Sequence, residues 1–276
     1  MKKNLIILFL ALISSLSFAQ VTLTIEGTVE NNTAYNGAYG IYVATTSAND
    51  NITNNTVYNN TDSGITFYYA PDNNVTRNTI YNNSIYGIYM IGNNGAISNN
   101  TVYKNPYGIY LYVSNNITAY NNSIFNSSAY GLYLRQLNRS NLYDNLVYGN
   151  AVGVLVSNSI NNTFNDTEIY SNSAEGFLIG GSSDNTTMTN IHLYNNSKYF
   201  MMGVTVTNMN VNMTNVTFDN ILGNFENYTS ISLNNSGGQF TINWTRNSST
   251  LPEYNISFQQ KFINITRVAG TVSLDN

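Results

Sequence analysis

Short segments in which apolar residues alternate with other residues recur along this chain at a nearly constant interval. Each segment begins with a glycine that is followed by apolar-x-apolar, as in Gly-Ile-Tyr-Val at residues 40–43. The interval between successive glycines is 24, 23, 21, 23, 22 and 23 residues. A fixed period of this length predicts a solenoid. The units begin at Gly40, Gly64, Gly87, Gly108, Gly131, Gly153 and Gly176.

A second alternating segment, typified by Asn-Thr-Val-Tyr at residues 100–103, lies between the glycine units. No part of the repeat has the 3.6-residue period of an amphipathic helix, and the Leu-x-x-Leu-x-Leu spacing of leucine-rich repeats is absent. About 22 residues accommodate three short strands and three turns. We therefore predict an all-β parallel β-helix of about eight rungs, each of about 22–24 residues.

Two columns of asparagine recur at fixed positions of this repeat. The first precedes the inward aliphatic residue by two positions and should stack inside the solenoid: Asn55, Asn78, Asn100, Asn122 and Asn145. The second follows the aromatic residue of the second strand, with Ser127 as an exception: Asn60, Asn83, Asn105, Asn150, Asn172, Asn196 and Asn220. Asparagine tolerates left-handed backbone, so we expect the second column to occupy turns. Both columns are interpreted as structural.

The Gly-Ile-Tyr-Leu and Asn-Thr-Val-Tyr-x-Asn units resemble the right-handed parallel β-helix repeats of pectate-lyase-like and NosD-like proteins. The resemblance covers about residues 34–220. It implies the architecture but no single activity, because that superfamily includes polysaccharide lyases, hydrolases, epimerases, phage tailspikes, copper-site maturation proteins and non-catalytic surface proteins.

The ends of the chain differ from the repeat. Residues 1–19 read as a signal peptide cleaved near Ala19, because a basic start and a short apolar run precede small residues. We predict an N-terminal cap at 20–34 and repeats over 35–224, followed at 225–276 by a cap or a truncated β-sandwich. Strands are expected in that last segment at 240–244, 254–258, 262–266 and 271–274.

Composition narrows the function classes. Charged residues make up 9% of the 276 residues, and 10 Lys+Arg against 14 Asp+Glu give a net charge of −4, which argues against a nucleic-acid partner. The chain has no cysteine, so disulfides cannot stabilise the predicted extracellular, cell-surface or periplasmic protein. Asparagine occurs 52 times and forms many Asn-x-Ser/Thr sequons, which leaves open whether the surface is glycosylated. No segment after the leader has the apolar length of a membrane span.

A carbohydrate-active enzyme of the pectate-lyase type is the main alternative to a non-catalytic module. Such an enzyme would need clustered acids and a basic residue on one face. The candidates are thinly spread, so no catalytic constellation is assigned: Arg135, Arg139, Asp144, Asp166, Glu168 and Glu175.

Copper handling is a second, minor alternative. His192 is the sole histidine, and several methionines lie near it in the sequence. Thioethers with one imidazole can bind Cu(I), but methionine at apolar strand positions usually fills a core, so no metal or cofactor is predicted. The methionines are Met188, Met201, Met202, Met209 and Met213.

An outward column of tyrosines is the best candidate for a contact surface. One tyrosine per rung, about 4.8 Å apart, would form a flat aromatic face on which sugar rings could lie, or would only stabilise neighbouring strands. The column is Tyr42, Tyr89, Tyr110 and Tyr133, interrupted by Thr66 and continued by Leu155 and Leu178. We therefore predict a structural, adhesive or glycan-binding module for polysaccharides or cell-surface glycans, of undetermined oligomeric state.

Overall fold

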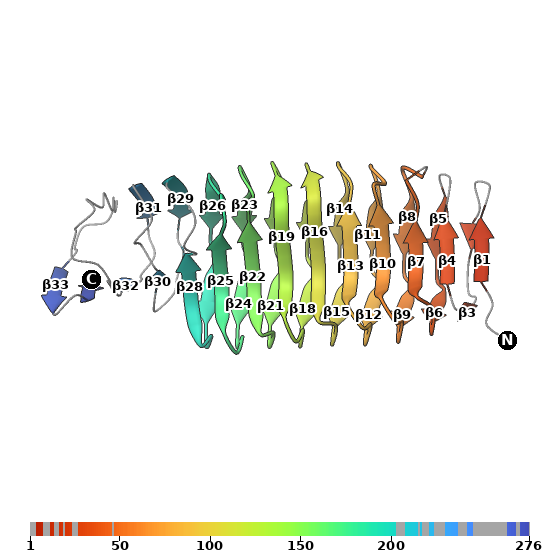
Figure 1. Cartoon of the computed structure of the whole chain (residues 1–276), viewed down its shortest axis with the longest axis horizontal. Helices are drawn as coiled ribbons and strands as arrows, with labels where there is room; N and C mark the ends of the chain where they lie inside the picture. Colours follow the sequence, from red (N-terminus) through yellow and green to blue (C-terminus); the bar gives the residue numbers. More distant parts are fainter. Residues whose placement is uncertain are drawn as a thin grey trace.

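The computed structural model describes the side chains of residues 27–45 and 47–197, together with Val211 and Val216. Beyond these it describes the backbone of strands at both ends of the chain. All the described elements are strands. Most of them lie side by side along the long axis of the molecule, in chain order from the N-terminus (Figure 1).

Three parallel sheets form a solenoid, and each rung up to residue 194 adds one strand to every sheet, whereas the described strands between residues 198 and 244 extend only two of the sheets. Neighbouring strands come from successive rungs, which confirms the predicted parallel β-helix. Sheet A contains β1 (Asn4–Ile7), β4 (Gln20–Leu23), β7 (Tyr39–Val43), β10 (Ser63–Tyr68), β13 (Tyr86–Ile91), β16 (Tyr107–Asn115), β19 (Tyr130–Asn138), β22 (Val152–Ser157), β25 (Glu175–Gly180), β28 (Lys198–Met202), β30 (Ile221–Gly223) and β32 (Ile242–Trp244).

Sheets B and C are built from shorter strands. Sheet B contains β2 (Leu12–Ile13), β5 (Thr28–Glu30), β8 (Asn51–Thr53), β11 (Asn74–Thr76), β14 (Ala96–Ser98), β17 (Thr118–Tyr120), β20 (Asn141–Tyr143), β23 (Thr163–Asn165), β26 (Thr186–Thr189), β29 (Asn208–Thr214) and β31 (Ser230–Ser236). Sheet C contains β3 (Ser17–Phe18), β6 (Thr33–Tyr35), β9 (Thr56–Tyr58), β12 (Thr79–Tyr81), β15 (Thr101–Tyr103), β18 (Ser123–Phe125), β21 (Leu146–Tyr148), β24 (Glu168–Tyr170) and β27 (His192–Tyr194).

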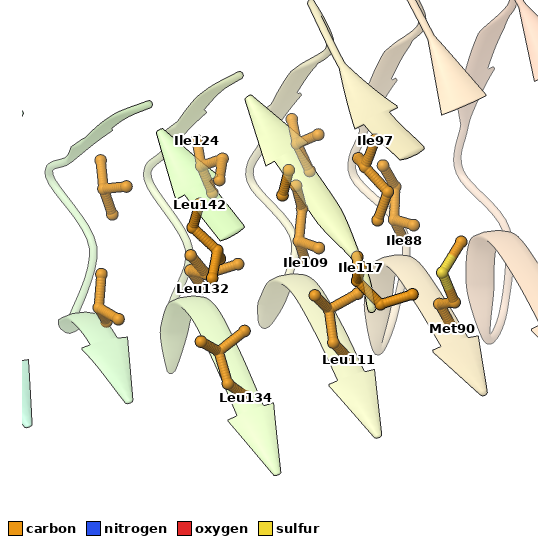
Figure 2. Close-up of a cluster of buried hydrophobic side chains, with 14 of the residues drawn as sticks. Ile88, Met90, Ile97, Ile109, Leu111, Ile117, Ile124, Leu132, Leu134 and Leu142 are labelled. Atoms are coloured by element: carbon orange, nitrogen blue, oxygen red, sulfur yellow. The ribbon is translucent and has the colours of Figure 1, made fainter. Parts of the chain in front are cut away.

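Aliphatic side chains from all three sheets fill the interior of the solenoid. In sheet A the residues on either side of the outward tyrosine point inward, as Ile88 and Met90 do, and are almost wholly buried. Side chains from successive rungs pack above one another, so the core is a continuous column rather than a sphere (Figure 2). Because the apolar residues alternate with period two, each sheet carries one row of apolar side chains on the face that points to the core.

Stacked asparagine amides line two corners of the interior, and the sequence predicts this for the column that includes Asn100. Asn100 is buried and uses both ends of its amide: its Oδ1 accepts from the N–H and Nδ2 of Asn78, and its Nδ2 donates to Val75 O and Asn122 Oδ1. These four hydrogen bonds are between 2.9 and 3.0 Å long. Each amide thus ties its rung to the rungs on both sides, which removes the cost of burying it.

The second asparagine column is buried in the same way, but the prediction that it has left-handed backbone is wrong. Asn60 Nδ2 donates to Asn83 Oδ1 at 2.8 Å, and the left-handed φ of 54° belongs to the preceding residue, Asn59. Asn59 is exposed and turns the corner, which points the next side chain inward. The same positive φ recurs one residue before the other members that the structure describes, whereas Asn220 lies outside the described residues.

Both ends of the repeat continue into further strands. Within 20–34, β4, β5 and β6 pair with β7, β8 and β9 of the next rung. Within 225–276, β31 and β32 extend sheets B and A, and β33 (Asn264–Val268) pairs antiparallel with β34 (Thr271–Asp275). The strand predicted at 254–258 lies outside the described residues, and the domain boundaries stay predictions.

Candidate glycan-binding face

The predicted tyrosine column exists on the outer face of sheet A. Tyr89 pairs in register with Tyr110, and Tyr110 pairs with Tyr133. Thr66 separates Tyr42 from Tyr89, as the sequence predicts. The column then continues through Leu155 and Leu178.

A second tyrosine column lies beside the first, and sequence reasoning missed it. It is formed by the residue just before each repeat glycine, which also points outward. The signal was present as Tyr-Gly in four of the repeat units. Its described members are Tyr39, Tyr86, Tyr107 and Tyr130. In β10, the strand that carries Thr66, the second-column position is occupied by Ser63. We refer to the two columns together as the tyrosine face.

The rings of the tyrosine face stack on one another. Tyr110 and Tyr133 have ring centroids 4.6 Å apart and planes only 6° from parallel. Tyr89 and Tyr110 are 5.3 Å apart at 25°, and Tyr86 lies 4.8 Å from Tyr89. Because the rings cover each other's faces along the sheet, only their edges can reach solvent, and Tyr110 at the centre is 7% exposed. A ligand therefore meets a row of phenol edges, and not the flat aromatic platform that the spacing alone suggested.

Arg135 closes one side of this face. Its guanidinium carbon lies 5.4 Å from the centroid of the Tyr112 ring, a cation–π arrangement, and its positive charge lies close enough to Tyr110 to act on the pKa of that phenol. Tyr112 and Arg135 are in register on β16 and β19. The face thus offers phenol hydroxyls with one cation at its edge.

Burial of the tyrosine face perturbs its ionisation. Tyr110 is only 7% exposed, and desolvation raises its pKa to about 12, although the nearby Arg135 acts in the opposite direction. Desolvation also raises the pKa of Tyr89, and the neighbouring Tyr110 adds to the effect. The phenols therefore stay neutral hydrogen-bonding groups far above neutral pH.

We expect the fold to lose stability in alkali because of these two phenols. Both tyrosines have a folded-state pKa above their unfolded value of 10.0, so their contribution is fully present below pH 10.0. The contribution of Tyr110 is lost as the pH rises through about 12, and that of Tyr89 is lost at still higher pH. When thermal unfolding is measured at increasing pH above 10.0, the melting temperature should fall as the pH rises. Replacing Tyr89 and Tyr110 with Phe should make that fall shallower, and an unchanged slope would contradict the assignment.

A longer aromatic ladder runs along the outer face of sheet C. Its centroids are 4.8–5.2 Å apart and its planes deviate from parallel by only 2–9°. This ladder lies on another side of the solenoid, and among the described residues it has no second aromatic column beside it. It is therefore a suitable control for the tyrosine face of sheet A. Its members are Tyr35, Tyr58, Tyr81, Tyr103, Phe125, Tyr148, Tyr170 and Tyr194.

The charged residues considered for catalysis are distributed over several faces. Arg135 and Glu175 are both in sheet A, but two rungs and five strand positions separate them in register. Glu168 lies on sheet C, where it accepts a hydrogen bond from the Tyr194 hydroxyl. The remaining three occupy corners with left-handed backbone, namely Arg139, Asp144 and Asp166. Asp144 and Asp166 occupy the same corner of successive rungs, but the fold does not bring all six groups together.

Sequence-family comparison now identifies the chain. Residues 12–124 match the family described as right handed beta helix region, and residues 84–229 match the family described as periplasmic copper-binding protein (NosD). The second match covers more than half of the chain. The chain belongs to the NosD family. No curated protein sequence matches it significantly.

Solved structures share the fold of this NosD-family chain at low sequence identity. The A-module of mannuronan C-5 epimerase AlgE6 from Azotobacter vinelandii has 14% identity and a TM-score of 0.59, with 88% of this chain and 81% of that chain covered. Tailspike protein 2 of bacteriophage CBA120 has 13% identity and a TM-score of 0.57, with 90% of this chain covered. The chain spans 41% of the length of that tailspike domain.

A surface adhesin is a third structural neighbour. PfbA of Streptococcus pneumoniae has 10% identity and a TM-score of 0.53, with 100% of this chain and 90% of that chain covered. At these identities the likeness concerns the fold alone. This structural likeness supports the parallel β-helix fold. Any argument about the activity of this chain has to rest on its own residues.

The described residues do not fit the copper of the NosD family description. Met188 is wholly buried in the core from β26, whereas His192 is exposed on the outer face of sheet C. The two side chains point to opposite sides of the wall and cannot bind one ion. No group of three or more His, Cys, Asp or Glu that could hold a metal occurs in the described part of the chain. The side chains of Met201, Met202, Met209 and Met213 lie outside it.

Proposed function

We propose that this NosD-family chain is a non-catalytic glycan-binding module outside the cytoplasm, and that it binds polysaccharide or cell-surface glycan on the tyrosine face of sheet A. The observation that carries the proposal is the pair of adjacent tyrosine columns, in register over β13, β16 and β19 and edged by Arg135.

The chemistry of this face suits a sugar polymer. Phenol edges combine apolar carbon with hydroxyls that both donate and accept, and a glycan presents the same mixture. Phenols with a pKa of 10.0 or above are protonated at physiological pH, so these hydroxyls are donors there, and the raised pKa values of Tyr89 and Tyr110 extend this to more alkaline pH. The repeat of about 4.8 Å per rung extends the array along the solenoid axis, in the direction in which a linear chain would run.

The structural neighbours support the ligand class but not a reaction. An epimerase that acts on mannuronan and a surface adhesin share the fold. The rival proposal, a carbohydrate-active enzyme, needs acids and a base that converge. Asp144 and Asp166 occupy the same corner of successive rungs, but the basic candidates Arg135 and Arg139 lie elsewhere on the solenoid.

Location outside the cytoplasm follows from the predicted signal peptide with cleavage near Ala19, and the periplasmic description of the NosD family agrees with it. The described part of the chain contains no helix long and apolar enough to span a bilayer. No cofactor is proposed.

Three substitutions on the tyrosine face test this function. In a panel of acidic and neutral polysaccharides, we expect the wild-type protein to be retained without releasing unsaturated or reducing ends. Changing Tyr89, Tyr110 and Tyr133 to Ser should weaken retention about tenfold or more, because it removes the central contacts of the face. The matched control changes Tyr58, Tyr81 and Tyr103 of the sheet C ladder to Ser and should retain wild-type affinity.

Three outcomes would contradict the proposal. Equal loss in the two triple variants would indicate general aromatic adhesion rather than a site. Unchanged retention of the sheet A variant, with its fold verified by circular dichroism, would exclude the tyrosine face. Turnover of a polysaccharide would establish the enzymatic alternative instead.

A further inference from the structure

The outer face of sheet C is flat and regular over many rungs. Successive rings of its aromatic ladder lie 4.8–5.2 Å apart, and their planes differ by only 2–9° from β6 to β27. On the tyrosine face of sheet A, rings of successive rungs tilt by as much as 48°. Because strands in a sheet normally rotate relative to their neighbours, the near-parallel rings of sheet C show that this face has little twist.

A column of hydroxyl side chains runs beside the aromatic ladder. In each three-residue strand of sheet C from β6 to β18, the middle side chain is buried and the other two point outward. The third residue supplies the ring of the ladder, and the first is threonine or, in one rung, serine. These first residues are in register and half-buried, so part of each side chain reaches solvent. We refer to them as the threonine column: Thr33, Thr56, Thr79, Thr101 and Ser123.

The two columns form a grid of neutral groups. Rungs repeat about every 4.8 Å along the solenoid, and the two outward positions of one strand are about 6.6 Å apart. Neither column contains a charged residue between β6 and β18. At the corners of these rungs, Arg77 and Lys104 take left-handed positions that asparagine occupies in the other rungs. The grid therefore repeats hydroxyls and apolar carbon at two fixed intervals.

Such a grid suits a lattice of ordered water. Water molecules on a prism face of hexagonal ice repeat in two perpendicular directions, at distances close to the two spacings of the grid. The threonine hydroxyls can both donate to and accept from waters of that lattice. The methyl groups and ring edges between them order water without competing hydrogen bonds. A charged group would orient water around itself, and the grid contains none from β6 to β18.

We propose that the outer face of sheet C, from β6 to β18, binds the surface of ice. This function is independent of glycan binding on sheet A. Each contact is weak, because a hydroxyl exchanges one water partner for another. The rigid solenoid lets all the rungs of the grid engage together, so the contacts reinforce one another. Molecules held on the ice surface prevent the lattice from growing between them, which lowers the temperature of ice growth and leaves the melting point unchanged.

Ice partition and the growth of a single ice crystal test this face. We expect the wild-type protein to enter slowly growing ice, to shape the crystal into facets and to hold ice growth below the melting point. Thr79→Lys together with Thr101→Lys should abolish all three effects, because two long cations in adjacent rungs lift the lattice off the middle of the grid. The matched control is Asn51→Lys together with Asn74→Lys, which adds the same charges in adjacent rungs of sheet B and should behave like the wild type.

The two triple variants described for glycan binding give a second, opposite test. The sheet C variant breaks the aromatic ladder of the grid, so it should lose the ice effects and keep its polysaccharide binding. The sheet A variant should keep the ice effects and lose its polysaccharide binding. This comparison also decides the matter if the double lysine variant of sheet C does not fold.

Several results would overturn the ice-binding face. One is a wild-type protein that growing ice excludes and that leaves crystal growth unchanged, whatever its affinity for polysaccharide. Another is equal ice activity in the two double lysine variants, both shown to be folded by circular dichroism. A third is ice activity that survives in the sheet C triple variant and vanishes in the sheet A triple variant. Ice activity without any polysaccharide binding would support this face and contradict only the glycan proposal.

Discussion

Replacing Asn100 with Ala should destabilise the solenoid by about 3–5 kcal/mol, because it removes a fully used amide from the middle of a buried ladder. The change removes the Asn100 Oδ1 acceptor from the Asn78 N–H and Nδ2 and the Asn100 Nδ2 donor from Val75 O, although Asn78 Nδ2 keeps Ile52 O and Thr76 O as acceptors. Asn122 Oδ1 loses one donor as well. Asn78 and Asn122 are each 1% exposed and Val75 is wholly buried, so bulk water does not readily replace the lost partners.

Asn100→Asp isolates the polar part of this effect, because the carboxylate has nearly the same shape as the amide. It would face Val75 O and Asn122 Oδ1, two acceptors to which it can no longer donate. Its pKa should therefore lie above the unfolded value. The variant should be most stable at acid pH and lose stability as the pH rises through the folded pKa.

Chemical denaturation at several pH values measures both Asn100 variants. Asn74→Ala is the matched control: Asn74 is exposed on sheet B and shares only one hydrogen bond, with Asn51, so its loss should cost no more than about 0.5 kcal/mol. An Asn100→Ala variant as stable as Asn74→Ala would refute the structural role of the ladder.

Adding one methyl group to a repeat glycine should destabilise the fold nearly as much. A Cβ at Gly87 would lie 2.5 Å from Gly108 O and 2.5 Å from Val102 Cγ1, with Asn105 Nδ2 at 2.9 Å. The first of these atoms is backbone of the next rung and cannot yield without distorting the sheet. We expect Gly87→Ala to cost about 2–3 kcal/mol through this overpacking.

Gly180→Ala provides the comparison within the same sheet. Nothing lies within 4 Å of a Cβ at Gly180 at the end of β25, so the substitution should leave stability unchanged or raise it slightly. This expectation is tested by comparing the denaturant concentrations at which the Gly87→Ala and Gly180→Ala variants are half unfolded. Equal midpoints would show that the repeat glycines are not required for close approach.

The close packing around Gly87 also explains why glycine marks the repeat. The glycine Cα, the asparagine amide of the second ladder and the inward aliphatic residue of sheet C converge at one corner of every rung. Ser127 shows the tolerance of this arrangement, because it replaces an asparagine there and leaves its Oγ buried without a partner. The ladder continues on both sides of this defect.

Local periodicity determined much of this structure. The spacing of the glycines and the alternation of apolar residues were enough to predict three parallel sheets, the tyrosine column of sheet A and the inward asparagine column that includes Asn100, because a solenoid converts a sequence period directly into a spatial column. The burial of the second asparagine column was not predicted. Even the interruptions at Thr66 and Ser127 could be placed in advance. The left-handed corner was misplaced by one residue, since asparagine occupies both adjacent positions at many corners.

Only the tertiary structure decided how the side chains of neighbouring columns meet. It showed that the tyrosine rings cover each other's faces, that Tyr86 and its equivalents double the column, and that Thr66 lies unpartnered where both columns stop. It also showed that Met188 and His192 lie on opposite sides of one wall. These relations depend on ring orientation and on contacts between residues about 22 positions apart, and a linear pattern specifies the rung but not the angle at which its side chains pack.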